Sequence, residues 1–383
     1  QPNFIPKDGR GLNPLLQNYW MVIHPPTLFL GFALTLVPFA YLIAGLWKNK
    51  LTEWIKPALP WAAFSAAILG IGITMGAYWA YETLNFGGYW NWDPVENASF
   101  VPWLVLIGAI HTMIAHRNSS AALKTSIILV ISTFILVLYS TFLNRSGVLG
   151  NASVHSFTDL GLSGQLLIYM FTFLIGAIIL AVYRWKSLPK DEKEIGIYHK
   201  EFWIFVGASV LTLSAFQLIF TTSIPVYNKI AEAFGMVSNI ALPADQVAHY
   251  SKIQIWIFIA VALLSGIGQY VWWGKLKQST SFKPLYSSLL ISVLLTVIVI
   301  NFEKVYEIPY IALLWSGLFS LVANGQILWF LTKQKFSIAG GALSHVGLAI
   351  MIIGVLFSSG YSKVVPLNRS GFAISNKVEQ FTK

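Results

Sequence analysis

The chain has 383 residues, of which 56% are apolar and only 10% are charged, and its mean hydropathy is +0.66. A soluble domain carries about 25% charged residues, so this composition excludes an ordinary soluble enzyme and favours a polytopic membrane protein. The absence of cysteine excludes disulfides, iron–sulfur clusters and thiolate metal sites within the chain, and it leaves seven histidines as candidate metal or haem ligands.

Apolar stretches long enough to cross a bilayer recur along the whole chain. A spanning helix needs about 17–25 residues. The pattern predicts an all-α, polytopic transmembrane helical bundle of about ten spans, in which the connections after 116 and after 301 are short. The expected spans are 24–47, 59–81, 99–116, 122–143, 162–184, 201–222, 253–273, 285–301, 308–332 and 339–359.

Basic residues are distributed unevenly between the two sides of this bundle. If consecutive spans alternate, fifteen Lys and Arg lie in the loops after 47, 116, 184, 273 and 332, and four lie in the internal loops of the other side. The positive-inside rule predicts that the first side is cytoplasmic and that both chain ends lie outside. The net charge of +10 is thus a topology signal, and no basic patch alternates with aromatic residues as a nucleic-acid site requires.

The two ends of the chain and one long loop are the largest segments outside the predicted spans besides the one between the second and third spans. The external segment 1–23 has no positively charged stretch before a short apolar core, so we expect no signal peptide. Loop 223–252 contains a mildly amphipathic stretch from Tyr227 to Ile240, for which we expect an interfacial helix. Segment 360–383 loses the membrane pattern and is expected to begin an external domain. The predicted organisation is therefore 1–23, a transmembrane bundle at 24–359, and 360–383.

An aromatic segment, residues 82–103, lies on the predicted outer side between the second and third spans. It has no Lys or Arg, and it combines many rings with a Gly-Gly pair and an Asp-Pro pair. An interfacial aromatic belt explains the rings but not these pairs. Glycines allow a flat surface to approach the backbone, so the residues leave open a belt and a site for a flat aromatic ligand. The candidate residues are Phe86, Gly87, Gly88, Tyr89, Trp90, Trp92 and Asp93.

Two histidines, His24 and His155, fall on the same outer side. His24 precedes two prolines at the expected start of the first span, where proline is structurally natural. His155 follows the fourth span. Two neutral imidazoles can ligate haem iron axially, although on chemistry alone a solvated loop residue is the more ordinary interpretation of each.

Two further histidines, His111 and His345, lie inside predicted spans. They are roughly 7–8 Å and 9 Å from the inner ends of their spans at 1.5 Å per residue. An ionisable residue inside a span is a functional candidate, and a buried histidine bonded to a neighbouring helix is the structural alternative. Structural or solvated roles are expected for His116, His199 and His249.

Four motifs together resemble a known family. FGGYWNWDPVENASFVPW, residues 86–103, resembles the tryptophan-rich WWD signature of the haem-handling superfamily that includes CcmC, CcmF and CcsA. GRGLNPLLQNYWMVIHPPTLFLGF (9–32), TFLNRSGVLGNASVHSF (141–157) and GGALSHVGLAI (340–350) resemble histidine-bearing segments of the CcmF family of cytochrome c haem lyase subunits. Phe86 and Tyr89 depart from the usual tryptophans, which keeps a ring face but removes an indole N–H donor.

The resemblance implies roles for the candidate residues. It assigns His24 and His155 as the external axial pair beside the WWD segment, and His111 and His345 as a transmembrane pair that holds a haem b. Arg145, which follows the fourth span, would pair with a haem propionate, since guanidinium binds carboxylates bidentately; an interface anchor is the alternative. Asp93 and Glu96 are expected to bind backbone N–H groups, because they would repel the propionates.

The resemblance also implies a function. Haem bound as substrate at the outer WWD segment would be attached covalently to apocytochrome c, with a haem chaperone and apocytochrome thiol-handling subunits as partners. The inner haem b would pass electrons outward, with quinol as the candidate source, in a bacterial inner membrane. Compared with the family, the chain is expected to be a middle portion of a longer protein. The alternatives are a haem exporter or relay, a quinol-oxidising b-type cytochrome subunit, and a transporter without a cofactor.

Overall fold

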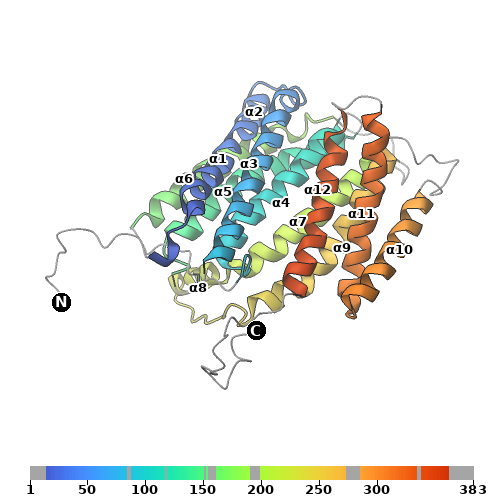
Figure 1. Cartoon of the computed structure of the whole chain (residues 1–383). Coiled ribbons are helices and arrows are strands. Elements are labelled where there is room, and N and C mark those ends of the chain that lie inside the picture. The colour runs from blue at the N-terminus through green and yellow to red at the C-terminus, as the bar shows by residue number, and fades with distance from the viewer. Residues whose placement is uncertain are drawn as a thin grey trace, which may run out of the picture. The chain divides into compact units, whose positions relative to one another are not determined.

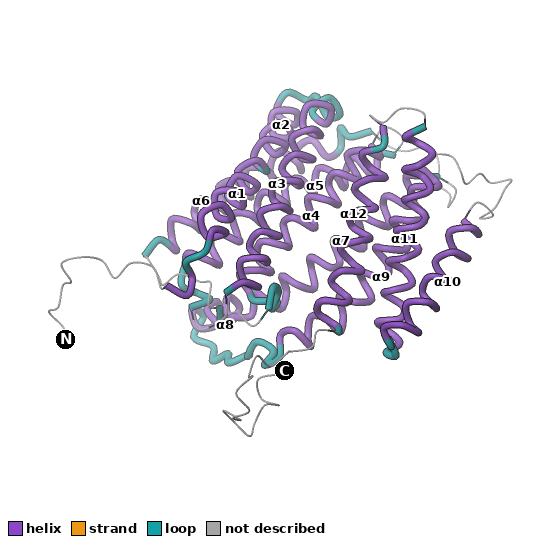
Figure 2. The backbone as a smooth tube through the Cα atoms, viewed as in Figure 1, coloured by secondary structure: helices purple, strands orange, loops and turns teal. Residues whose placement is uncertain are grey.

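A computed structural model describes residues 14–83, 88–116, 119–150, 152–153, 161–189, 199–272, 285–333 and 338–361. All regular structure within these ranges is helical (Figure 2), which confirms the all-α fold class. The helices are α1 (Tyr19–Leu34), α2 (Leu36–Trp47), α3 (Ile55–Glu82), α4 (Pro94–Ala115), α5 (Ser120–Arg145), α6 (Ser163–Trp185), α7 (Lys200–Thr222), α8 (Ile224–Ala233), α9 (Gln246–Trp272), α10 (Tyr286–Glu303), α11 (Ile308–Thr332) and α12 (Gly340–Val355), with single turns at Pro14–Leu16 and Leu356–Gly360.

Ten helical segments in the described part of the chain are long and apolar enough to cross a membrane, which confirms the predicted number of spans. The two short connections both separate distinct helices. Ser119 caps the start of α5 by accepting the N–H of Ala122 at 3.1 Å. Lys304 ends α10 in the left-handed conformation, with φ 54°, and Pro309 then starts α11. The protein is therefore a multi-pass membrane protein.

The first span consists of two helices, α1 and α2, that meet at Thr35. Pro38 has no N–H to donate to the carbonyl of Leu34, so the regular ladder is interrupted at this point. The Thr35 hydroxyl instead donates to the carbonyl of Phe32 at 2.6 Å. The span also begins at Tyr19, ahead of the predicted 24, because Asn18 caps it by accepting the N–H of Trp20. The prediction that His24 lies at the helix start was wrong, since His24 and the two prolines after it lie inside α1.

Contacts divide the chain into two compact units, Gln1–Ile257 and Phe258–Lys383, so that α9 contributes to both. Each unit is described by itself. The predicted end segments 1–23 and 360–383 fall largely outside the described residues, and the division into those segments and one bundle stays a prediction.

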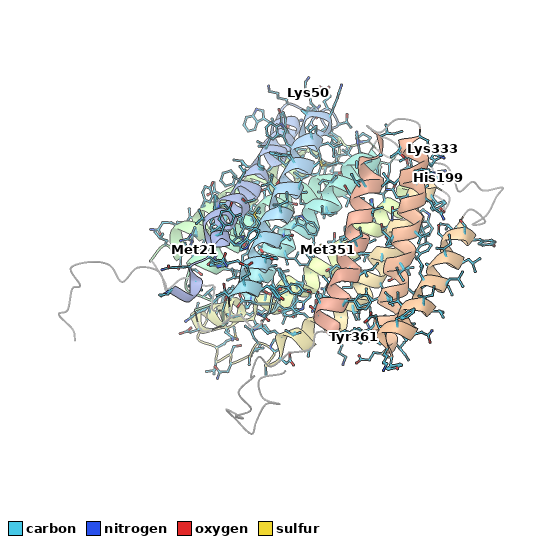
Figure 3. All side chains as sticks on the ribbon, in the orientation of Figure 1. Met21, Lys50, His199, Lys333, Met351 and Tyr361 are labelled. Carbon is cyan, nitrogen blue, oxygen red and sulfur yellow. The ribbon has the colours of Figure 1, made fainter. Side chains whose placement is uncertain are left out.

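In the first unit, α4 and α5 form the centre. α4 packs along α5 and α7, α3 packs between α1 and α4, and α6 covers α5 and α2 (Figure 1). More than half of the residues in the membrane-spanning stretches of α4 and α5 are buried, whereas the residues of α6 are mostly exposed. Figure 3 places Met21 and Lys50 at opposite ends of this unit, as expected for the two ends of one span.

Loop 223–252 contains the short helix α8, which confirms a helix in that loop but ends it earlier than the expected Ile240. Gly235 follows with φ 71°, a left-handed conformation that glycine adopts without steric cost. The N–H of Met236 then donates to the carbonyl of Ala231 at 2.9 Å, which closes the helix end. Figure 1 shows α8 at the end of the first unit where α1 begins.

In the second unit, α11 packs against α10 and α12. Polar side chains link α9 to α11 within this unit. Asn324 of α11 donates to Ser265 of α9 at 3.1 Å, and Tyr270 of α9 donates to Gln326 of α11 at 2.5 Å. Such bonds add modestly to helix association in a membrane. Figure 3 places Lys333 and Tyr361 at opposite ends of this unit, after α11 and α12 respectively.

Candidate functional site

The WWD segment continues directly into α4, and its two acidic residues form the helix cap. Asp93 accepts the N–H of Val95 at 2.9 Å, while Glu96 accepts the N–H groups of Asp93 and Asn91 at 3.1 and 3.0 Å. This reciprocal arrangement is a capping box. It confirms the expectation that both carboxylates bind backbone N–H groups, and it fixes the path of the chain into α4.

Trp92 occupies the left-handed backbone region, with φ 55°. This conformation costs a bulky residue about 1–2 kcal/mol, so it persists only where neighbours enforce it. The buried Asn97 side chain donates to the carbonyl of Trp92 at 2.8 Å and to the hydroxyl of Thr222 at 3.2 Å. The indole N–H of Trp92 donates to Ser251 of α9 at 3.3 Å. Hydrogen bonds to α4 and to α9 therefore hold Trp92 in this conformation.

The rings of the segment form one contiguous cluster. Trp90 lies 5.9 Å from Trp92 and 5.6 Å from Phe100, and Phe100 stacks on Trp103 at 5.7 Å. Trp92 also packs on the buried Tyr250 at 5.6 Å. Trp92 therefore joins the segment to the core, Trp90 is a half-buried member of the cluster, and Tyr89, the residue before it, is also half-buried. Of the other predicted ligand-facing residues, Gly88 is described, while Phe86 and Gly87 lie outside the described residues.

The loop after α5 is tied to the same helix start. Ser153 donates to the carboxylate of Asp93 at 2.6 Å, so Asp93 joins the WWD segment to the chain two residues before His155. His155 itself lies outside the described residues. Arg145 is the last residue of α5 and is half-buried at the beginning of this loop.

His24 is seated against α3 where that helix carries two glycines four residues apart. Its Nδ1 lies 2.8 Å from the carbonyl of Gly72, and its ring lies 6.0 Å from Trp79. A Cβ added at Gly76 would lie 2.6 Å from Cε1 of His24. Glycine at 76 therefore leaves the space for the imidazole. Glycine at 72, where an added Cβ would lie 2.8 Å from Cα of Leu28, lets α1 approach α3 closely, as small residues do between membrane helices.

Hydrogen bonding sets the tautomer of this ring. A carbonyl only accepts, so a neutral His24 donates from Nδ1 to Gly72 and holds its lone pair on Nε2. Metal-ligating histidines commonly use one ring nitrogen in this way, which orients the other for the metal. His24 has the geometry of such a ligand.

His111 and His345 lie inside membrane helices, as predicted, in the first and second units respectively. The Nδ1 of His111 lies 2.7 Å from the carbonyl of Ile107, and that of His345 lies 2.7 Å from the carbonyl of Gly341. The Gln269 amide also lies 3.3 Å from Nδ1 of His345. By the same argument a neutral His111 holds its lone pair on Nε2. Nδ1 of His345 faces both an acceptor carbonyl and the Gln269 N–H donor, so its contacts do not set its tautomer. His116 makes an equivalent bond to Met113 at 2.6 Å, so the bond alone does not identify a ligand.

Sequence reasoning missed the residues that support these candidates. Asn97 and Ser153 carry no signal in a single sequence, because their partners are far away in the chain. Gly72 and Gly76 did carry one, since their spacing of four residues on an apolar span is a known close-packing pattern. The Asp93–Glu96 spacing was likewise readable as a helix start, and with it α4 would have been predicted to begin at Pro94.

Comparison with known proteins gives the family. Residues 3–150, which contain His24 and the WWD segment, match the family described as Cytochrome C assembly protein. The chain is 32% identical over 370 residues to the cytochrome c-type biogenesis protein CcmF of Escherichia coli K12, covering 94% of this chain and 55% of that protein. It is 30% identical over 367 residues to CcmF of Pseudomonas fluorescens, covering 93% and 54%.

The chain belongs to the CcmF family of cytochrome c assembly proteins. A solved structure, "Cytochrome c Heme Lyase CcmF", has the same fold, with a TM-score of 0.67 and 21% identity over 90% of this chain and 52% of that one. The chain thus spans a little over half the length of the curated CcmF proteins it matches. The matched residues 3–150 include Arg145 and His111 but end before His155 and His345.

Proposed function

We propose that this CcmF-family chain acts in cytochrome c maturation, holding haem as substrate on the outer WWD segment and promoting its covalent attachment to apocytochrome c. The observation that carries this proposal is that hydrogen bonds of Asp93 join the WWD segment to a distant loop of the chain. One helix cap, Asp93, binds both the start of α4 and the loop that leads to His155. A belt of interfacial aromatics needs no such link between distant parts of the chain.

The described residues fit a haem at this site. A planar ligand needs partly exposed ring faces on a rigid platform, and Trp90, which belongs to the ring cluster, and Tyr89, which precedes it, are both half-buried. Axial ligation needs a neutral imidazole with a fixed tautomer. His24 meets that need because its Nδ1 is bonded to Gly72. We propose His24 and His155 as the external ligands, with Phe86, Gly87, Gly88 and Trp92 in the platform.

In the attachment step, each cysteine thiol of the apocytochrome adds across one vinyl C=C bond. One S–H bond breaks while one S–C and one C–H bond form, so the addition has no net oxidation. The chain contains no cysteine and supplies no nucleophile. Its contribution is to position the partners and to keep the axial imidazoles in place. Arg145, at the end of α5, is proposed to bind a propionate.

We also propose His111 and His345 as the axial ligands of an inner haem b. Nδ1 of each ring lies 2.7 Å from a carbonyl of its own helix, and for His111 this bond leaves the lone pair of the neutral ring on Nε2. A haem held there supplies one-electron chemistry, and quinol is the proposed donor. The proposed partners are a haem chaperone and thiol-handling subunits, and the proposed location is the bacterial inner membrane with the WWD segment outside.

The experiment is a visible reduced-minus-oxidised spectrum of the purified protein together with an assay of covalent haem attachment. We expect His111→Ala and His345→Ala to remove the b-type signal. His24→Ala and His155→Ala should keep that signal but abolish attachment. The controls are His116→Ala, which removes a similarly bonded ring from the same helix as His111, and His249→Ala on the outer side.

The outcomes separate the alternatives. Haem binding at the outer site without any attachment would favour an exporter or relay. A b-type signal that survives both His111→Ala and His345→Ala would contradict the inner site. Attachment unaffected by His24→Ala would contradict the external ligand.

A further inference from the structure

A groove lies between α2 and α6 in the first unit, on the part of the surface that faces the membrane. Its volume is about 770 Å³ and its surface is almost entirely apolar. The two helices touch through Phe39 and Phe173, whose rings lie 6.0 Å apart. The main lining residues are Phe39, Ile43, Trp47, Phe173, Gly176 and Leu180.

Small residues keep the groove open along its length. Ala40 and Ala44 line it from α2 and Gly176 from α6. A Cβ added at Gly176 would meet no described heavy atom within 4 Å. The space is therefore apolar and lined by small residues from both helices, which suits a hydrocarbon chain.

One end of the groove is cationic. Lys48 lines it there and is exposed. Arg184 of α6 reaches the same end, where its Nε and Nη2 donate to the carbonyls of Leu46 and Trp47 at 2.9 and 3.1 Å. Trp47, the last residue of α2, is 71% exposed at the same end, and indole rings favour the membrane interface. This end of the groove lies where α2 and α6 enter the loops after residues 47 and 184, which the charge distribution predicts to be cytoplasmic.

We propose that this groove binds an anionic phospholipid of the inner leaflet, with one acyl chain between α2 and α6 and its phosphate at Lys48 and Arg184. Basic pockets between membrane helices on the cytoplasmic side bind anionic headgroups. The charge complementarity specifies the lipid: an apolar helix of a partner would fill the groove without a use for the cations at its end. The proposal is independent of haem chemistry.

The test is native mass spectrometry of the intact chain extracted from nanodiscs of equal phosphatidylglycerol and phosphatidylcholine. The parent protein should retain phosphatidylglycerol preferentially. Lys48→Gln should lower that preference about fivefold, the effect of one basic residue near an anionic surface. Gly176→Leu should reduce retention of both lipids by filling the groove. Neither variant changes a residue of the proposed haem site.

Matched controls test whether the effects belong to the groove. Lys56→Gln removes an exposed cation from the same side, and Gly164→Leu enlarges an exposed glycine of α6 outside the groove. Both should retain lipid like the parent. Equal retention in Lys48→Gln and Lys56→Gln, or no preference in the parent, would overturn the proposal. A photo-crosslinking residue at Ala44 should label lipid, and labelling of a polypeptide instead would overturn it too.

Discussion

The imidazole of His24, the proposed external ligand, shows how a side chain is positioned by residues that have no side chain. Gly72 offers its carbonyl, and Gly76 leaves the space that the ring occupies. Neither contact depends on the chemistry of a bound group. A substitution at Gly76 is therefore expected to move the imidazole of His24 rather than to unfold the protein.

Gly76→Ala should displace His24. The new Cβ would lie 2.6 Å from Cε1, and because the helix backbone resists movement, the ring must move. Altering the support of a metal ligand typically costs about 10–100-fold in affinity, so if His24 is the proposed ligand we expect haem affinity at the proposed outer site to fall by that order. Haem titration followed by visible absorption measures it. Gly164→Ala, with no atom within 4 Å of its Cβ, is the control; equal affinities in the two variants would show that the space left by Gly76 is irrelevant.

Asn97 is the second residue whose effect can be predicted at this scale. It is fully buried and donates to the carbonyl of Trp92 and to Thr222. Asn97→Ala should lower the free energy of unfolding by about 1–3 kcal/mol, because the buried partners lose their hydrogen bonds. Thermal unfolding in detergent measures this change. Asn301→Ala, which removes an exposed amide that donates to the carbonyl of Val297 in its own helix, should have little effect; a similar loss in both would refute the argument.

At the scale of elements, the sequence predicted the number and type of the helices well, and their ends less well. Hydropathy measures only the apolar run, and it placed the starts of α4 and α9 inside the helices. The true starts are set by polar caps: Asp93 for α4, and Asp245, which accepts the N–H of Ala248, for α9. The link from Asp93 to Ser153 joins positions 60 residues apart. No local pattern in one sequence encodes such a pairing.

The start of α4 gives a prediction about an element. Asp93→Ala removes the cap and the Ser153 bond together, so it should cost more than the roughly 0.5–2 kcal/mol of a lost cap alone. Asp93→Asn keeps an acceptor and should restore most of the stability. Asp245→Ala removes the cap of α9, in which the carboxylate accepts the N–H of Ala248, and serves as the reference in thermal unfolding. If Asp93→Ala and Asp245→Ala are equally stable relative to the parent, the Ser153 link contributes nothing.

At the scale of the whole molecule, composition alone determined the class of protein. A charge content of 10% and the long apolar runs led directly to ten spans, which the helices confirm. The division into the units Gln1–Ile257 and Phe258–Lys383 was not foreseen, because α9 runs through the boundary as one continuous apolar helix. Hydropathy contains no information about which helices share contacts. The side on which each loop lies was inferred from charge and can be tested directly.

The absence of native cysteine makes that test clean, because any labelling by a thiol reagent reports only an introduced residue. Lys50→Cys and Lys333→Cys, in exposed turns after α2 and α11, should react with a membrane-impermeant maleimide only after the cells are permeabilised. Asn239→Cys and Lys304→Cys, also exposed, should react in intact spheroplasts. The expectation follows from the excess of Lys and Arg in the first set of loops. The unmodified chain is the control. The opposite pattern would place the WWD segment on the cytoplasmic side, where an apocytochrome that matures outside could not reach it.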